Sequence, residues 1–341
     1  MDKAQEGLYL GVDVGSVSTN LVLIDGEGQV QEALYLRTQG RPLETVLRGL
    51  QSLARSYSNE QINGVGTTGS ARSLAAVVVG ADVIKNEITA HAVAASNLVP
   101  GVRTILEIGG QDSKLILVKD GIVTDFSMNT VCAAGTGSFL DQQASRLQIP
   151  IEEFGQLAVK ASHPVRIAGR CSVFAESDMI HKQQMGHSLE DIISGLCEAL
   201  VRNFLNNLGK GKKIDSPIVF QGGVAANIGM CQAFEKALGH PVEVPQHHKV
   251  MGAVGAAILA SEAVAQRGGV SNFKGFTVAE QPFGARSFEC ADCPNLCEII
   301  ELQEAERVLS RWGDRCGKWT NALPSEVNNP AITAEMEATT P

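Results

Sequence analysis

The sequence predicts an α/β protein made of two similar lobes and a small cysteine-rich C-terminal tail. Three observations predict this fold class. A strand–turn–strand plan at 8–30 recurs at 103–126, a buried strand at 217–221 ends in paired glycines before a helix, and cysteines crowd the chain after residue 289. Alternating strands and helices are typical of α/β domains. With 341 residues the chain is long enough for two such domains.

The two strand–turn–strand segments match in one register. Equivalent positions carry an acidic residue, a glycine and a polar residue, followed by an apolar quartet. The matched pairs are Asp13 and Glu107, Gly15 and Gly109, Asn20 and Lys114, and 21–24 and 115–118. This agreement favours a duplicated lobe over two chance hairpins.

Each turn has the composition of a phosphate-binding loop. Glycine lets the backbone approach a phosphate closely, amide and hydroxyl groups donate to its oxygens, and an acidic residue at the strand end suits hydrated Mg²⁺. The predicted ATP and Mg²⁺ ligands are Asp13, Gly15, Ser16, Val17, Ser18, Thr19 and Asn20 in the first loop, and Glu107, Gly109, Gly110 and Lys114 in the second. Gln111 and Asp112 are the candidates to orient a hydrolytic water. A plain hairpin explains either turn alone, but the pair favours a nucleotide site.

A third glycine element lies at 217–230. Its Gly222-Gly223 turn, between a buried strand and a helix, can lie flat against a nucleoside. We therefore add Gly222, Gly223 and Asn227 to the predicted nucleotide ligands. The small-residue helix at 252–265 fits close packing against this region, or simple helix packing.

Composition excludes some classes of partner. The net charge of −9 and the lack of a basic stripe argue against nucleic acid. No apolar run reaches about 18 residues, and the N-terminus lacks the features of a signal peptide, so we expect no membrane partner and a cytoplasmic location. Eight cysteines in such a chain are poor disulfide candidates, which makes metal or redox chemistry worth testing.

The glycine elements DVGSVSTN, EIGGQDSK and QGGVAAN, in this order, resemble those of the acetate and sugar kinase, Hsp70 and actin superfamily. Two further stretches, NTVCAAGTGSFLDQQASRL at 129–147 and GRCSVFAESDMI at 169–180, resemble the activator (archerase) component of 2-hydroxyacyl-CoA dehydratases and related benzoyl-CoA reductase ATPases. The resemblance covers about residues 8–266. It implies two ribonuclease H-like lobes with a nucleotide cleft. Position 20 departs from the family, whose members often carry lysine there, and Lys114 would supply the missing charge.

The resemblance further implies a homodimer that shares one [4Fe-4S] cluster. Its cysteines fall on Cys132 and Cys171, and a twofold axis doubles two thiolates to the four that a cubane takes. The family takes electrons from ferredoxin or flavodoxin and, driven by ATP, passes them to an iron–sulfur dehydratase or reductase. After each cysteine, the sequence reads as a helix that opens after a segment of cysteine and small residues. From the residues alone, buried apolar cysteines would be the commoner interpretation, and we assign Cys197 and Cys231 to the core.

The tail carries Cys290, Cys293, Cys297 and Cys316, a fairly strong metal signal. Zn²⁺, a second Fe–S cluster, and a structural role without metal all remain open. We predict an N-terminal ATPase lobe at 1–100, a second lobe with the cluster cysteines at 101–266, a linker and Cys-rich segment at 267–321, and a disordered tail at 322–341.

Two rival functions remain. One is a sugar or small-acid kinase of the same fold, which would need a carboxylate base and would be indifferent to Cys132 and Cys171. The other is a non-catalytic, nucleotide-dependent scaffold. Neither explains why the CAAGTG and CSVFAES segments occur together. The identity of the partner protein and of its acyl-CoA substrate lies beyond the sequence.

Overall fold

The computed structural model describes residues 7–129, 131–305 and 307–320, which divide into two compact units. Unit 1 comprises the residues up to Ala90 and those from Gly252 onwards, and unit 2 comprises His91–Met251. The chain leaves unit 1 within helix α3 (Glu87–Leu98) and returns at the start of helix α9 (Met251–Gln266). The predicted disordered tail at 322–341 lies outside the described residues.

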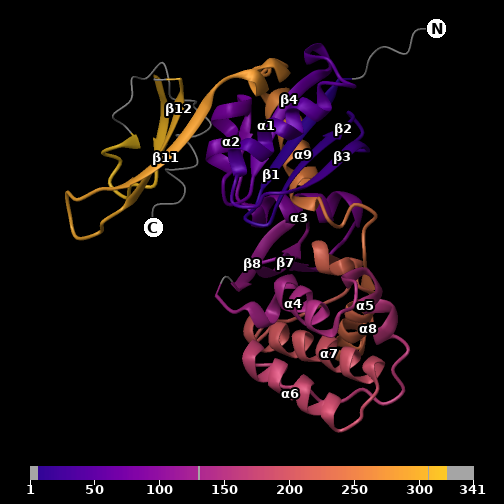
Figure 1. Ribbon diagram of the computed structural model, residues 1–341. Helices are drawn as coiled ribbons and strands as arrows, with labels where there is room; N and C mark the ends of the chain where they lie inside the picture. The colour runs from indigo at the N-terminus through magenta and orange to yellow at the C-terminus, as the bar shows by residue number, and fades with distance from the viewer. Residues whose placement is uncertain (1–6, 130, 306, 321–341) are drawn as a thin grey trace. The chain divides into compact units, whose positions relative to one another are not determined.

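Unit 1 is built on a sheet of order β3-β2-β1-β4-β5 (Figure 1). β1, β2 and β3 pair antiparallel, whereas β4 and β5 continue the sheet in parallel. These strands are β1 (Leu8–Val14), β2 (Ser18–Ile24), β3 (Val30–Arg37), β4 (Ile62–Thr68) and β5 (Val83–Ile84). Helix α1 (Pro42–Leu53) packs against β2, helix α2 (Arg72–Val79) packs against β1 and β4, and the short helix η1 (Asn59–Gln61) precedes β4.

Helix α9 lies directly on the sheet of unit 1 because two glycines leave room for it. A Cβ atom on Gly11 would lie 1.8 Å from the Ala253 carbonyl oxygen, and one on Gly66 would lie 2.0 Å from the Ala256 carbonyl oxygen. The small-residue helix therefore completes unit 1. The compact units consequently differ from the lobe boundaries that the sequence suggested, 1–100 and 101–266, because this packing depends on contacts between distant parts of the chain.

Unit 2 repeats the strand topology of unit 1. Its sheet order is β10-β9-β6-β7-β8, with β6, β7 and β8 antiparallel and β9 and β10 parallel to β6. The strands are β6 (Thr104–Ile108), β7 (Ser113–Lys119), β8 (Ile122–Asn129), β9 (Ile218–Gln221) and β10 (Val242–Glu243). β1 to β5 thus correspond in order to β6 to β10. The predicted duplication of the lobes is confirmed.

The helices of unit 2 lie together beside its strands (Figure 1). The core of this unit includes several large aromatic side chains. Phe234 packs edge-on against Phe204 and Phe220, at ring separations of 5.4 and 5.0 Å. The helices are η2 (Ala133–Gly135), α4 (Gly137–Leu147), α5 (Ile151–Ala158), α6 (Ser172–Gln184), α7 (Leu189–Leu208), η3 (Gly223–Ala226) and α8 (Ile228–Leu238). Within the described part of the chain, no helix has the length and apolar character needed to cross a membrane.

The segment after α9 is part of unit 1, not a loose linker. The buried Asp82 carboxylate accepts hydrogen bonds from the Ser271 hydroxyl and the Asn272 amide, both at 2.7 Å. The short helix η4 (Phe276–Glu280) then places Phe276 and Val278 in the core of unit 1. The first part of 267–321, predicted as a linker ahead of the Cys-rich segment, is therefore packed into unit 1 through its few apolar residues.

The cysteine-rich tail is folded as well. It forms an antiparallel sheet of order β11-β12-β13, with β11 (Phe283–Glu289), β12 (Glu298–Glu304) and β13 (Arg307–Trp312). Leu302 and Leu309 belong to the core of unit 1. The tail sheet is therefore attached to unit 1 by apolar packing.

Candidate functional site

The first glycine turn joins β1 to β2 in unit 1. The Gly15 amide donates to the Ser18 carbonyl oxygen at 2.9 Å, which closes the turn. Thr38 donates its hydroxyl to the Gly15 carbonyl oxygen at 2.9 Å, and its hydroxyl also contacts that of Thr19 at 3.0 Å. Thr19 is buried, so its hydroxyl supports the turn, whereas Ser16 is exposed at the tip.

A row of polar side chains lies at the carboxyl end of β1. Asn20 stands opposite Asp13 on β2, and Thr68 stands beside Asp13 on β4, so the three side chains share one face of the sheet. Asn20 and Thr68 are buried, and neither Asn20 Oδ1 nor Thr68 Oγ1 has a hydrogen-bond partner among the described residues. Buried polar atoms are normally paired. These two atoms therefore suit the polar groups of a ligand.

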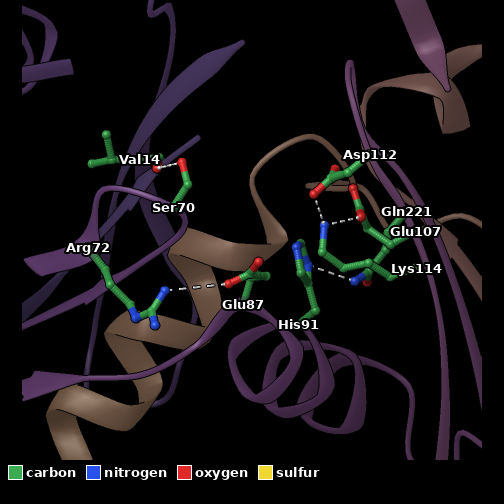
Figure 2. A network of polar contacts seen from close by, with 9 residues as sticks. All are labelled: Val14, Ser70, Arg72, Glu87, His91, Glu107, Asp112, Lys114 and Gln221. Carbon is green, nitrogen blue, oxygen red and sulfur yellow. Dashed lines mark hydrogen bonds and ion pairs between the residues drawn. The ribbon is translucent and has the colours of Figure 1, made fainter. Parts of the chain in front are cut away.

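Gly69 is a site residue of unit 1 that sequence reasoning missed. It follows β4 with φ of +89°, and a Cβ atom there would lie 2.5 Å from Asp13 Oδ1 and 2.6 Å from the Val14 carbonyl oxygen. Only glycine fits this conformation and this space. Ser70 donates its hydroxyl to the same Val14 oxygen at 3.2 Å (Figure 2). A buried strand that ends in Gly-Ser before a helix was the available signal.

The second glycine turn, between β6 and β7 in unit 2, has the same backbone geometry as the first. The Gly109 amide donates to the Asp112 carbonyl oxygen at 3.1 Å. Glu107 and Lys114 stand opposite each other in the register, as do the equivalent residues of unit 1. Gln111 is exposed at the turn. The two turns are thus copies in backbone but differ in side-chain charge.

Lys114 is the charged centre of the second turn. Its Nζ donates to Glu107 Oε2 at 2.9 Å and to Asp112 Oδ2 at 2.7 Å (Figure 2). Burial alone would lower the pKa of Lys114, but the negative charges of Glu107 and Asp112 outweigh it and raise this pKa above its ordinary value. Lys114 therefore stays charged between two carboxylates.

His91 and Gln221 are further residues that sequence reasoning missed. Gln221 Nε2 lies 2.9 Å from His91 Nδ1, and both side chains are buried (Figure 2). Burial, followed by the positive charge of Lys114, lowers the pKa of His91 to about 3. The imidazole is therefore neutral, and its Nδ1 accepts the hydrogen bond from the glutamine amide. His91 sits at a position with no local motif, so no sequence signal marked it.

Gly222 occupies in unit 2 the position that Gly69 holds in unit 1. It follows β9 with φ of +91°, and a Cβ atom there would lie 2.3 Å from the Ile108 carbonyl oxygen and 2.8 Å from Glu107 Oε1. Each glycine thus lies against the acidic residue and the last carbonyl group of the neighbouring strand. The duplication extends to a position that the sequence alignment of the two hairpins did not reach.

The Gly222 turn is held by His248. The Gly222 amide donates to the His248 carbonyl oxygen at 2.8 Å, and His248 Nδ1 lies 2.9 Å from the Gly222 carbonyl oxygen. Burial lowers the pKa of His248, so a neutral ring with a proton on Nδ1 makes this second bond. Gly223 is exposed beside it. Asn227 caps helix α8, since its side chain accepts from the Met230 amide at 3.1 Å.

Cys132 lies between β8 and α4. Asn129 fixes its backbone from both sides, because the Cys132 amide donates to Asn129 Oδ1 at 2.9 Å and Asn129 Nδ2 donates to the Cys132 carbonyl oxygen at 2.8 Å. A short 3-10 turn follows, and α4 begins only at Gly137. A helix therefore follows the segment of cysteine and small residues, as predicted, and Thr136 adopts an extended conformation as the N-cap of α4.

The start of α4 holds the second glycine turn. The Gly137 amide donates to the Gly109 carbonyl oxygen, and the Ser138 amide to the Gly110 carbonyl oxygen, both at 2.9 Å. The Ser138 hydroxyl also donates to the Gly110 carbonyl oxygen, at 2.5 Å. The segment that carries Cys132 is therefore hydrogen-bonded to the predicted phosphate loop of unit 2.

Cys171 is the N-cap residue of α6, as the sequence predicted. Its segment meets that of Cys132 at the buried side chain of Asn203 on α7. Asn203 Nδ2 donates to the Gly169 carbonyl oxygen at 2.7 Å, and a Cβ atom on Gly135 would lie 2.7 Å from Asn203 Oδ1. Two segments far apart in sequence thus converge on one amide.

The two cysteines have the donor chemistry of half an iron–sulfur site. Both thiols are free and partly exposed. The apolar side chains next to them are exposed, with Val131 at 94%, Val173 at 66% and Phe174 at 68% of full exposure. No group of three or more histidine, cysteine or acidic side chains in the described residues is arranged to hold a metal ion. One chain offers two thiols here, and a cubane takes four.

The core cysteines of unit 2 have different surroundings. Burial raises the pKa of Cys197 to about 12 and that of Cys231 to about 11. Both therefore remain protonated thiols at neutral pH. Their environment agrees with the core role that their helical spacing predicted.

Comparison with known proteins bears on these features. A sequence model described as the BadF/BadG/BcrA/BcrD ATPase family matches residues 10–260. The chain is 34% identical over 271 residues to the (R)-2-hydroxyglutaryl-CoA dehydratase activating ATPase of Acidaminococcus fermentans, covering 75% of this chain and 98% of that protein. It is also 34% identical to the 2-hydroxyisocaproyl-CoA dehydratase activator of Clostridioides difficile, covering 74% and 94%. A crystal structure of that activator with bound ADPNP matches with a TM-score of 0.70 and 30% identity, covering 77% and 98%.

Proposed function

The chain belongs to the BadF/BadG/BcrA/BcrD ATPase family, and on this premise we propose that it is an ATP-dependent activator that delivers electrons to a 2-hydroxyacyl-CoA dehydratase or a related iron–sulfur reductase. One observation carries the proposal. The segment that begins at Cys132 is hydrogen-bonded through Gly137 and Ser138 to the glycine turn of unit 2. A nucleotide that binds this turn would therefore act on the segment that bears a cluster cysteine.

The chain's own residues suit the binding of ATP and Mg²⁺. The exposed parts of the turns present backbone amides to phosphate oxygens, and Asp13 and Glu107 stand at the strand ends where a hydrated Mg²⁺ would be held. In unit 1, Asn20 Oδ1 and the Thr68 hydroxyl offer buried polar atoms that lack partners among the described residues. In unit 2, Gly222 lets the turn after β9 lie against Glu107 and the Ile108 carbonyl group, and the exposed Gly223 beside it has open space at its Cβ position, where a nucleoside could lie.

Hydrolysis of ATP needs a positioned water and little covalent chemistry. Gln111 is exposed at the turn and free to orient such a water. Asp112 is held by Lys114, so its carboxylate can accept a proton only in competition with that ion pair. We assign the water-orienting role to Gln111 and a supporting role to Asp112.

Cys132 and Cys171 are the proposed ligands of a [4Fe-4S] cluster shared across a homodimer. Such a cluster supplies one-electron transfer when bound. Asn129 and Asn203 position the two cysteine segments, and a second copy of the chain brings the thiolates to four. The exposed Val131, Val173 and Phe174 beside the cysteines support a subunit interface at this face, because large exposed apolar side chains usually mark contact surfaces.

Coupling follows from the bonds between turn and helix. If ATP and ADP favour different positions of Gly109 and Gly110, they also bias α4 and the Cys132 segment, since these share hydrogen bonds. The proposed donor of the electron is ferredoxin or flavodoxin. The proposed acceptor is the iron–sulfur protein that the activator serves.

The proposal is tested by anaerobic purification of the full chain, iron and sulfide assays, and EPR after dithionite reduction. We expect one cluster per dimer in the wild type, its loss in Cys132→Ala and in Cys171→Ala, and its retention in Cys231→Ala. Cys231 is a matched control because it is a half-buried cysteine that packs against the core of the same unit. A wild-type protein that never takes up iron, but phosphorylates an added sugar, would replace the activator with a kinase.

A further inference from the structure

The tail sheet brings together cysteines that the proposed function leaves unused. β11 ends at Glu289 and β12 begins opposite it at Glu298, so Cys290 and Cys297 extend the antiparallel pairing by one step. The Cys290 amide donates to the Cys297 carbonyl oxygen at 2.8 Å. The two cysteines are therefore cross-strand partners, and such partners place their Cβ atoms about 4.5–5.5 Å apart on one face.

Cys293 lies in the tight connection between these partners. The Leu296 amide donates to the Cys293 carbonyl oxygen at 3.2 Å, which closes a turn over Cys293-Pro-Asn-Leu296. Proline at the second position of a β-turn is favourable because its φ is already set. The turn brings the chain back from Cys293 to Cys297 and keeps Cys293 at the same end of the sheet.

The segment that carries Cys316 returns to this end as well. After β13, a Cβ atom on Gly313 would lie 2.3 Å from the carbonyl oxygen of Glu298, the neighbour of Cys297. Trp319 packs edge-on against Phe288 of β11, with ring centroids 4.9 Å apart. Cys316 lies between these two anchor points, so it sits at the end of the sheet where the other cysteines lie.

A polar chain links the two segments directly. The Cys290 thiol donates to Asp292 Oδ2 at 3.2 Å, and the Lys318 ammonium contacts the same oxygen. The first cysteine of the array and a residue two positions after the last one therefore meet at a single carboxylate. A lysine at this place also supplies positive charge next to the sulfur atoms.

We propose that Cys290, Cys293, Cys297 and Cys316 bind a single Zn²⁺ ion as four thiolates. Four cysteines at the end of a small antiparallel sheet are a donor set typical of structural zinc. With Zn–S bonds of about 2.3 Å, a tetrahedral ion holds its sulfur atoms about 3.8 Å apart, which cross-strand cysteines can reach. Lys318 would offset the negative charge that four thiolates leave on the site.

Zinc binding would have to draw Cys293 and Cys316 towards the paired Cys290 and Cys297. In the structure the thiols do not converge as ligands, and Cys293 and Cys316 are exposed. Exposed side chains turn freely, so both can rotate towards Cys290 and Cys297 when the metal arrives. The platform itself is fixed, because the buried Glu301 carboxylate of β12 binds Arg286 of β11 and Arg311 of β13, each at 2.6 Å.

The test uses the full chain with Cys132→Ala and Cys171→Ala, which removes the thiols assigned to the shared cluster. After exposure to Zn²⁺ and gel filtration, mass spectrometry of the metal content should give about one zinc ion per chain. Co²⁺ in its place should show the absorption of a tetrahedral thiolate complex. Adding Cys293→Ser and Cys316→Ser should abolish both signals, whereas adding Cys231→Ala should leave them unchanged.

Three results would overturn the proposal. They are a background protein that takes up no zinc, zinc that survives the loss of Cys293 and Cys316, and iron with acid-labile sulfide at the tail in place of zinc. If the background variant does not fold, zinc is measured on Cys293→Ser against the wild type, with iron counted separately, and an unchanged zinc content sinks the idea. The proposal stands apart from the activator function, since neither Cys132 nor Cys171 contributes to it.

Discussion

The glycine turns of the two units share a backbone and differ in charge. Gly15 and Gly109 close their turns with the same amide-to-carbonyl bond, at 2.9 and 3.1 Å. At the strand end, however, unit 1 places the uncharged Asn20 opposite its acid, whereas unit 2 places Lys114, paired with two carboxylates. The two units therefore share the backbone of the turn, while the residue opposite the acid differs in charge.

This difference in charge indicates which interactions stabilise each turn. In unit 2 the buried Lys114 ammonium binds two carboxylates, so its removal takes a hydrogen-bonded cation away from both. In unit 1 the residue that stands opposite the acid is the uncharged Asn20. We therefore expect mutations at equivalent positions to have unequal effects.

The largest effect should follow from Lys114→Met. It leaves the buried Glu107 without its cation, and breaking a buried pair costs about 3–5 kcal/mol of unfolding free energy. Urea unfolding measures the loss, and steady-state ATP hydrolysis should fall with it. Lys119→Met, an exposed site on the same strand, is the matched control and should change stability by less than about 1 kcal/mol. Equal losses in the two variants would contradict the assigned role of the pair.

The second largest effect should come from the two glycines that follow β4 and β9. Gly69→Ala and Gly222→Ala each force a Cβ atom onto a carbonyl oxygen at positive φ, and each should cost about 3 kcal/mol. Gly121→Ala is the control, because its φ is +79° but nothing lies within 4 Å of its Cβ position, and it should cost about 1 kcal/mol. Thermal unfolding and nucleotide titration measure both changes. A Gly121 variant as unstable as the others would show that backbone conformation alone, not crowding, explains these sites.

The third prediction concerns the pH dependence of the unfolding free energy, which His91 in unit 2 should cause. His91 has a pKa of about 3 in the folded protein against an ordinary value of 6.5, so between these values the unfolded chain binds a proton that the folded chain does not. The contribution of neutral His91 to the unfolding free energy is fully present above pH 6.5, and it declines as the pH falls towards 3. From pH 7 to pH 5 the unfolding free energy should drop by about 2 kcal/mol.

Urea unfolding at several pH values checks this decline. His91→Gln should flatten the pH dependence by that amount, whereas His181→Gln, at an exposed position on α6, should leave it as in the wild type. The same slope in all three proteins would mean that other groups cause the acid sensitivity.

The smallest effect should come from Asn20→Lys, which gives unit 1 the charge of unit 2. An added cation beside the phosphate loop should tighten ATP binding a few-fold, equivalent to about 0.5–1 kcal/mol. Calorimetric titration with ATP measures the change. Asn20→Met introduces a side chain of similar length to lysine but without charge, and it should not tighten ATP binding. Unchanged or weaker affinity in the lysine variant would mean that the site needs the amide itself.

The sequence was sufficient for features whose cause is local. The repeat of Asp13 and Gly15 in Glu107 and Gly109 predicted both turns, and the family segments predicted Cys171 as a helix cap. The helix after Cys132 was predicted too, but nothing in AAGTG shows that Thr136 would separate a short 3-10 turn from α4.

Features that depend on distant contacts could not be predicted. Gly69 corresponds to Gly222 only because each follows a parallel strand beside the acid-bearing strand, and no shared motif surrounds them. His91 and Asn203 act through residues more than thirty positions away, and the docking of 271–280 depends on Asp82 in the first part of the chain.

The packing of α9 on Gly11 and Gly66 has a consequence for the order in which the protein forms. The first ninety residues leave the ribosome long before α9 exists to cover their sheet, whereas unit 2 has its whole core in one continuous stretch. Unit 2 can therefore fold during translation while the sheet of unit 1 still waits for its cover. The half of the molecule that is made first is completed last, and until then its uncovered apolar surface is a natural target for chaperones.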